Sequence, residues 1–347
     1  MYQLQSAIWE LTLECNLRCS HCGSSAGRAR ENELGTSECY QLCEELAELD
    51  CENVCLMGGE PFLRKDFFQI GQAVKDLGMD LSIVSNGTML VNHLSRLSTL
   101  EPKVIGISLD GMKEHHEAIR GNGTWDKTVN SIEKLREAGL QTTVITTVSR
   151  INFRDLIEMR KLIKGKGIGW QIQVAMPFGN FQKDNVLSPE DFYATAMFIA
   201  KERVENAAKD MPVVGAHCYG YYSEILPGCG KWNGCTAGIS TIGITSDGGI
   251  TGCLSLGNDR FLEGNVRKGG LRGIWEDSGA FSYNRKFTIE LLGQNCADCK
   301  HAGECKGGCN SVSYCLTGKF HNDSYCFHAI ERKLLKVRSR GYRRLKE

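Results

Sequence analysis

Cysteine is the feature that most constrains this chain. Of its 347 residues 17 are cysteine, seven of them between residues 15 and 55 and ten between residues 218 and 326. No segment has the pattern of a secretory signal or a membrane span, so we expect a cytoplasmic protein with reduced thiols. Thiols in a reducing compartment serve as metal ligands or catalytic groups more often than as disulfides. The two groups therefore predict two metal-bearing regions.

Short β-rich segments alternate with helical patterns through the first half of the chain. We expect strands at 7–13, 53–57, 80–85, 104–109, 141–148 and 169–174. Strands that alternate with helices predict a parallel sheet with right-handed crossovers, and six strands rather than eight predict an incomplete barrel. The expected fold is α/β, a partial (β/α)6 TIM-like barrel whose chemistry lies at the carboxyl ends of the strands.

The character of the sequence changes near residue 212. Beyond it the chain is rich in glycine and cysteine and poor in long apolar periodicities, so we expect bound metal to stabilise it. We predict a barrel over 1–212, a cysteine-rich domain over 213–330 and a basic tail over 331–347. The tail has eight Lys or Arg against two Glu, which is typical of a solvated helix end. The formal net charge of the chain is zero, which indicates neither a membrane surface nor nucleic acid as a partner.

The first cysteine motif follows the first predicted strand. Cys15, Cys19 and Cys22 have the spacing C-x3-C-x2-C. Three thiolates leave one iron of a four-iron cluster open to a ligand that is not protein. An open iron indicates a catalytic cluster rather than a structural one. Structural zinc is the alternative, although zinc usually takes a fourth Cys or His and His21 is poorly placed for that role. Four further cysteines are expected to pack as small apolar side chains: Cys39, Cys43, Cys51 and Cys55.

This motif resembles that of the radical SAM superfamily, in which the open iron binds the amino and carboxylate groups of S-adenosylmethionine. His21 stands where the family usually has an aromatic-type residue. Glycines let the backbone approach a ligand, and carboxylate or carbonyl oxygens suit an ammonium group. The family's GGE motif, which binds the methionyl amino group, is matched after the second predicted strand by Gly58, Gly59, Glu60 and Pro61.

A stretch after the fourth predicted strand extends the resemblance to the SPASM-bearing branch of the superfamily. It includes Ser108, Asp110 and Arg120. The resemblance implies that Ser108 and Arg120 hold the methionine carboxylate, Arg120 through a bidentate fork. It also implies that Asn86, after the third predicted strand, approaches the ribose. The alternative is that Asp110 lies in a turn and Arg120 on a helix surface.

The second cysteine group is similar to the full SPASM pattern. Eight cysteines make two sets of four, as two fully ligated cubane clusters require. The resemblance implies a nearer auxiliary cluster held by Cys229, Cys235, Cys253 and Cys309, and a farther one held by Cys296, Cys299, Cys305 and Cys326. Cys315 and Cys218 are left over, and either would be an alternative to an assigned ligand. Two zinc ribbon sites are the other interpretation.

The resemblance implies a radical SAM oxidoreductase whose cofactors are S-adenosylmethionine and three 4Fe-4S clusters. An electron from a donor such as flavodoxin or ferredoxin would cleave S-adenosylmethionine to a 5'-deoxyadenosyl radical, which removes hydrogen from substrate. SPASM enzymes mostly modify peptides or proteins, so we expect a ribosomal-peptide (RiPP) maturase that introduces an oxidative modification or cross-link. Because 14 residues precede Cys15, we expect a separate leader-peptide recognition protein or direct recognition of the peptide.

Three other functions stay open. The first is an anaerobic sulfatase maturase, which forms formylglycine. Those enzymes carry Asp after the cysteine that matches Cys253, whereas this chain has Leu254, so Asp247 or Asp259 would have to compensate. The second is radical modification or decarboxylation of a small molecule or porphyrin, and the third is a non-catalytic metal-binding module. No general base stands out, and a packing role is the simpler interpretation of the candidates Glu224, His217, Tyr221 and Tyr222.

Overall fold

The computed structural model of the protein describes residues 2–206, 210–216, 219, 223, 225–227, 232–256 and 259–334. Several residues named above lie outside these ranges, as does the tail from residue 335: His217, Cys218, Tyr221, Tyr222, Glu224 and Cys229. The side chain of Asp259 is also outside the described part.

Six parallel strands form the centre of the fold. They are β1 (Ser6–Thr12), β2 (Asn53–Gly58), β3 (Asp80–Ser85), β4 (Val104–Ser108), β5 (Thr142–Val148) and β6 (Gly169–Val174). Each pairs in parallel with the next along the chain. Every boundary lies within one residue of its predicted position, and the predicted partial barrel is confirmed.

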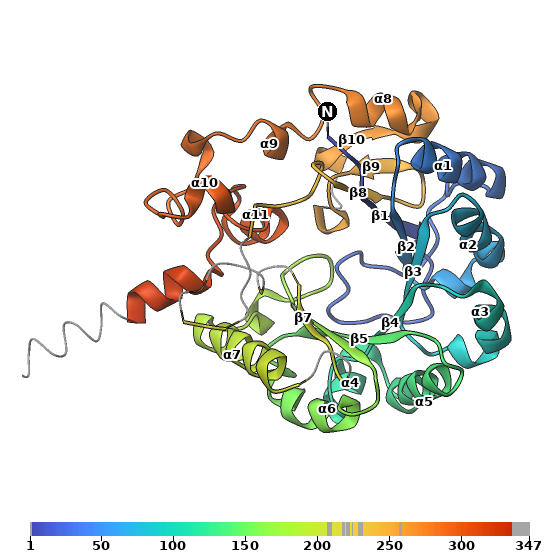
Figure 1. Cartoon of the computed structure of the whole chain (residues 1–347), viewed down its shortest axis with the longest axis horizontal. Helices are drawn as coiled ribbons and strands as arrows, with labels where there is room; N and C mark the ends of the chain where they lie inside the picture. Colours follow the sequence, from blue (N-terminus) through green and yellow to red (C-terminus); the bar gives the residue numbers. More distant parts are fainter. Residues whose placement is uncertain are drawn as a thin grey trace, which may run out of the picture.

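The helices run along the outside of the curved sheet (Figure 1). They are α1 (Thr36–Glu48), α2 (Phe67–Asp76), α3 (Leu94–Leu100), α4 (Lys113–Arg120), α5 (Thr124–Glu137), α6 (Leu156–Ile163) and α7 (Pro189–Glu205). No helix in the described ranges is long and apolar enough to span a membrane.

The cysteine-rich region continues the barrel sheet, which the sequence did not predict. Strand β8 (Thr241–Ile244) pairs in parallel with β1, and β9 (Gly249–Thr251) and β10 (Leu262–Asn265) follow in antiparallel fashion. Strand β7 (Val213–Gly215) lies beside β6, so the order of the ten strands is β10-β9-β8-β1-β2-β3-β4-β5-β6-β7. The chain then forms α8 (Gly270–Glu276), α9 (Ser282–Arg285), α10 (Ala302–Cys305) and α11 (Asn310–Thr317) (Figure 1). A domain division near residue 212 stays a prediction.

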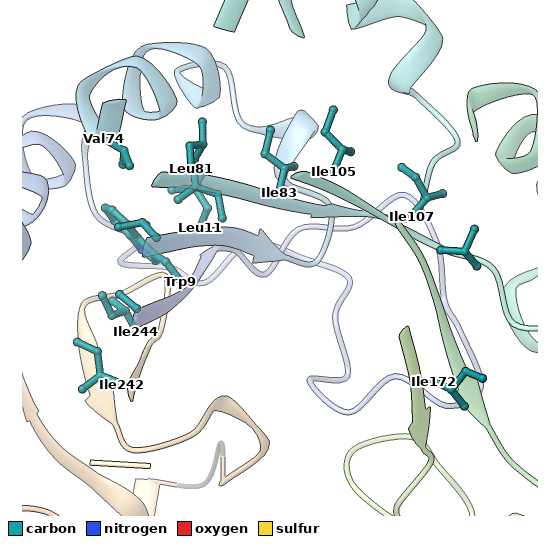
Figure 2. Close-up of a cluster of buried hydrophobic side chains, with 14 of the residues drawn as sticks. Trp9, Leu11, Val74, Leu81, Ile83, Ile105, Ile107, Ile172, Ile242 and Ile244 are labelled. Carbon is teal, nitrogen blue, oxygen red and sulfur yellow. The ribbon is translucent and has the colours of Figure 1, made fainter. Parts of the chain in front are cut away.

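Alternate residues of each strand face opposite sides of the sheet. Trp9 and Leu11 of β1 are fully buried in the layer beneath the helices, with Leu81 of β3 and Val74 of α2 (Figure 2). Ile8, the residue before Trp9, points to the other side of the sheet and lines a cavity there. The outer face of the sheet thus forms the core, and the inner face is available to ligands.

Candidate active site

A cavity of about 660 Å³ lies at the carboxyl ends of the parallel strands. One part of its wall consists of the loop after β1 and the ends of β2 to β6. Another part comes from the cysteine-rich region and includes Cys235, Cys253 and Cys309. The fold therefore brings the two cysteine groups to a single space.

Cys15, Cys19 and Cys22 all line this cavity. Burial raises the pKa of the Cys19 thiol to about 11. The Arg120 guanidinium opposes this shift, and the neighbouring Cys22 and Cys15 add to it. In the described ranges no three Cys, His, Asp or Glu side chains are grouped so as to hold a single metal ion. Thiols that repel one another as thiolates need positive charge between them, which the irons of a cluster provide. The donor set fits such a cluster.

Asp110, at the end of β4, is a fully buried carboxylate beside this loop. Its Oδ2 accepts hydrogen bonds from His21 Nε2 at 2.7 Å and from Arg120 Nε at 2.5 Å, and its Oδ1 accepts one from the Thr147 N–H at 2.9 Å. Burial opposes ionisation, but the Arg120 and His21 side chains hold the pKa of Asp110 well below its usual range. Asp110 therefore forms a buried charge cluster with Arg120 and His21 beside the first cysteine motif.

His21 lies on the cavity wall with 8% of its side chain exposed. Its Nε2 faces Asp110, whereas its Nδ1 is buried with no hydrogen-bond partner in the described chain. Buried polar atoms are nearly always hydrogen-bonded, so this nitrogen would take a partner from outside the described chain.

Five of the seven residues predicted to contact S-adenosylmethionine line the cavity: Gly58, Gly59, Asn86, Ser108 and Arg120. Glu60 lies behind the wall, where Oε1 accepts a hydrogen bond from Ser85 Oγ and Oε2 one from the Asn86 N–H, both at 2.9 Å. Burial raises the pKa of Glu60 to about 7. Its carboxylate joins the ends of β2 and β3 and positions Asn86. Direct contact of Glu60 or Pro61 with the cofactor stays a prediction.

Gly58 and Gly59 are required by the close approach of two backbone segments. Gly58 has a φ of 146°, and a Cβ there would lie 2.2 Å from the carbonyl oxygen of Thr12. A Cβ at Gly59 would lie 2.1 Å from the carbonyl oxygen of Glu14. The end of β2 therefore packs directly against the loop that carries Cys15.

We expect Gly59→Ala to weaken binding of S-adenosylmethionine about tenfold or more. The added methyl group pushes the end of β2 away from the cysteine loop, and overpacking of this kind costs about 1–3 kcal/mol. Calorimetric titration of the anaerobically reconstituted protein measures the affinity. Gly273→Ala is the matched control, because a Cβ at Gly273 meets nothing within 4 Å. Equal affinities of the two variants would contradict the prediction.

The described cysteines of the second group, apart from Cys315, form two sets. Burial raises the pKa of Cys309 far above its usual range, and the nearby Cys235 and Cys253 raise it further, so these three are neighbours. In the other set, burial raises the pKa of Cys326 to about 12, with further contributions from Asp323, Cys305 and Cys296. Cys299 acts in the same way on Cys305. This is the division that the resemblance implied, except that Cys229 lies outside the described residues.

Three of the cysteines expected to be buried are so: Cys39, Cys43 and Cys51. Cys55 differs, because it shares the inner face of β2 with Met57 and lines the cavity. Cys315 Sγ lies 3.4 Å from the carbonyl oxygen of Pro177. The ligand roles of all the candidate cysteines stay predictions.

Residues 9–163 match the radical SAM superfamily, and residues 235–300 match SPASM, an iron-sulfur cluster-binding domain. Mycofactocin maturase MftC of Mycolicibacterium smegmatis is 30% identical over 88% of this chain and 78% of its own. This chain belongs to the radical SAM superfamily. An AdoMet-dependent heme synthase of Methanosarcina barkeri is 28% identical over 94% of this radical SAM protein and 97% of its own length.

Two solved structures show the same fold as this radical SAM protein. Streptococcus suis SuiB bound to S-adenosylmethionine has a TM-score of 0.75 at 16% identity, over 93% of this chain and 77% of its own. Native anSMEcpe with bound AdoMet has a TM-score of 0.72 at 19% identity, over 96% of this chain and 99% of its own. As a radical SAM protein with a SPASM domain, this one is an enzyme of oxidative radical chemistry that uses S-adenosylmethionine and iron-sulfur clusters.

Proposed function

We propose that this enzyme is a peptide maturase, which removes hydrogen from a peptide side chain and leaves an oxidative modification or a cross-link. The cavity carries this proposal, because Cys15, Cys19 and Cys22 line it together with Cys235, Cys253 and Cys309. A substrate in that space is exposed both to the site of radical formation and to an electron acceptor. MftC is by name a maturase, and SuiB has also been solved with precursor peptide SuiA.

The first three cysteines would hold the cluster at which S-adenosylmethionine is cleaved, which supplies a 5'-deoxyadenosyl radical. Arg120 and Ser108 would bind the methionine carboxylate, and the backbone at Gly59 the amino group. Asn86, whose Nδ2 donates to Asn16 Oδ1 at 2.8 Å, would approach the ribose. Asp110 fixes the guanidinium of Arg120 through Nε. Nη1 of the same guanidinium donates to Cys19 Sγ at 3.8 Å, which places Arg120 beside the first cysteine motif.

Two auxiliary clusters complete the proposed set of three. Cys235, Cys253 and Cys309, with Cys229, would hold the nearer one. Cys296, Cys299, Cys305 and Cys326 would hold the farther one. Clusters ligated by four thiolates have no open iron, so they suit electron transfer rather than substrate binding. An external electron donor of the flavodoxin or ferredoxin type is the partner that this scheme requires. The peptide would be recognised directly by this enzyme or through a separate leader-peptide recognition protein.

The β5 and β6 part of the cavity wall carries neutral hydrogen-bonding groups. Gln173 Nε2 donates to Thr147 Oγ1 at 3.0 Å, and Gln171 Nε2 donates to Gln173 Oε1 at 3.3 Å. All three side chains line the cavity. Amide and hydroxyl groups both donate and accept, which matches the amide groups of a peptide. Formylglycine formation has less support, since Leu254 follows Cys253 and the Asp247 carboxylate accepts a hydrogen bond from Thr245 Oγ1 at 2.6 Å.

A second candidate function is radical modification of a porphyrin, because the heme synthase relative matches over nearly its full length. One experiment separates the two. Reconstituted protein, S-adenosylmethionine and a reductant are incubated with short peptides encoded beside its gene, or with an iron porphyrin that carries propionates. We expect a peptide to lose hydrogen, seen by mass spectrometry, together with a rise in 5'-deoxyadenosine. Decarboxylation of the porphyrin, with all peptides unchanged, would contradict the peptide proposal.

A further inference from the structure

One buried hydroxyl group in the cysteine-rich region has no hydrogen-bond partner within the described chain. It belongs to Tyr283 of helix α9. Buried hydroxyl groups are hydrogen-bonded in the great majority of protein structures, so an exception needs a physical explanation. None of the roles proposed above involves this residue.

The surroundings of the hydroxyl group indicate what it faces. It lies against Gly252, where a Cβ would be 2.0 Å from the hydroxyl oxygen. Gly252 precedes Cys253 and lines the cavity, so the missing side chain leaves room for the phenol beside that cysteine. Burial raises the pKa of Tyr283, and Cys235, Cys253, the Glu263 carboxylate and Cys309 raise it further, so the phenol is a neighbour of all three cysteines. A neutral phenol is a hydrogen-bond donor.

Contacts on several sides hold Tyr283 in this position. Asn284 Nδ2 donates to the carbonyl oxygens of Cys235 and Ala237, both at 2.7 Å, which fixes α9 on the loop that carries Cys235. The carbonyl oxygen of Tyr283 lies 2.6 Å from His321 Nε2. Its ring stacks on Phe320 with centroids 4.6 Å apart. The unpartnered hydroxyl is therefore placed by its neighbours and does not result from a loose side chain.

We propose that Tyr283 donates its O–H to a sulfur atom of the nearer auxiliary cluster and thereby raises the reduction potential of that cluster. This inference rests on the proposed cluster at Cys235, Cys253 and Cys309. Negative charge on the sulfur atoms grows when a cluster is reduced, and a hydrogen-bond donor stabilises the added charge. Tyr283 thus sets how readily the cluster accepts an electron.

The test is a redox titration of Tyr283→Phe, followed by electron paramagnetic resonance on full-length, anaerobically reconstituted protein. We expect iron and sulfide contents equal to those of the parent, and one cluster that is harder to reduce. At a fixed potential its reduced-to-oxidised ratio falls about tenfold, which is about 59 mV for one electron. Repeating the titration with Cys15, Cys19 and Cys22 changed to Ala assigns the shift to an auxiliary cluster.

Tyr314→Phe is the matched control. Tyr314 lies in the same aromatic cluster, 5.1 Å from Phe320 between centroids, but its hydroxyl accepts a hydrogen bond from Arg260 Nη1 at 3.0 Å. We expect this control to leave every potential unchanged. A Tyr283→Phe protein with normal iron content and unchanged potentials would overturn the inference.

A second variant decides the question if Tyr283→Phe fails to take up its clusters. Incorporation of 3-fluorotyrosine at position 283 keeps the shape of the ring and makes the phenol a stronger donor. We expect the potential of the same cluster to rise, and an unchanged potential would overturn the inference. Neither titration requires a substrate, so failure of the peptide proposal would leave the result intact. A parent protein without cluster signals beyond the first would instead contradict the proposed set of three clusters.

Discussion

Asp110→Asn is expected to destabilise the protein by about 3–5 kcal/mol and to abolish most of its activity. The substitution leaves the buried Arg120 guanidinium without its counter-charge, and removing one partner of a buried ion pair has a cost of that size. It also frees His21 and Arg120, both on the cavity wall, from the positions that Asp110 imposes. Chemical denaturation measures the free energy of unfolding, and calorimetric titration measures the affinity for S-adenosylmethionine.

The control for this prediction is Asp126→Asn. The Asp126 carboxylate also pairs with a cation, Lys113 Nζ at 2.6 Å, but both side chains are more than half exposed. Exposed pairs of this kind contribute little, so we expect stability and affinity close to those of the parent. If Asp110→Asn were as stable as this control and bound S-adenosylmethionine equally well, the central electrostatic role of Asp110 would be wrong.

The second large effect is expected from Cys19→Ala. Loss of one of three thiolates removes the first cluster, so the iron content of the reconstituted protein should fall by about a third, from about twelve atoms to about eight. Formation of 5'-deoxyadenosine should fall to the background level. Iron analysis and mass spectrometry of the same sample measure the two quantities.

Cys43→Ala is the matched control for Cys19→Ala. Cys43 is a fully buried cysteine of α1 that does not line the cavity. We expect it to keep the full iron content and the activity. An undiminished iron content in Cys19→Ala would show that this cysteine is not a ligand.

The central strands were predictable because a parallel strand covered by helices has a strong local pattern of apolar and β-branched residues. Strands β7 to β10 were not, because they are three or four residues long and depend on pairing across the sheet: β7 with β6, β8 with β1, β9 with β8 and β10 with β9. Cys15, Cys19 and Cys22 were identifiable as candidate ligands from their spacing, which would place several ligands on one short loop.

Roles that depend on distant partners were not visible in the sequence. Asp110 lies at a predicted strand end, but its significance comes from His21, 89 residues away. Glu60 belongs to a recognisable motif, yet the hydrogen bonds that its carboxylate accepts from Ser85 and Asn86 are not visible in that motif. The position of Tyr283 depends on contacts with segments around Cys235 and His321 that only the folded chain brings together.

The most direct measurement of the central claim is 5'-deoxyadenosine formation by the unmodified protein. Anaerobically reconstituted protein, shown to contain iron and sulfide, is given S-adenosylmethionine and a strong reductant, and the products are quantified by mass spectrometry. We expect 5'-deoxyadenosine and methionine in equal amounts, because one cleavage produces one of each. Protein that is full of iron and sulfide but forms no 5'-deoxyadenosine would contradict the account and favour a non-catalytic metal-binding protein.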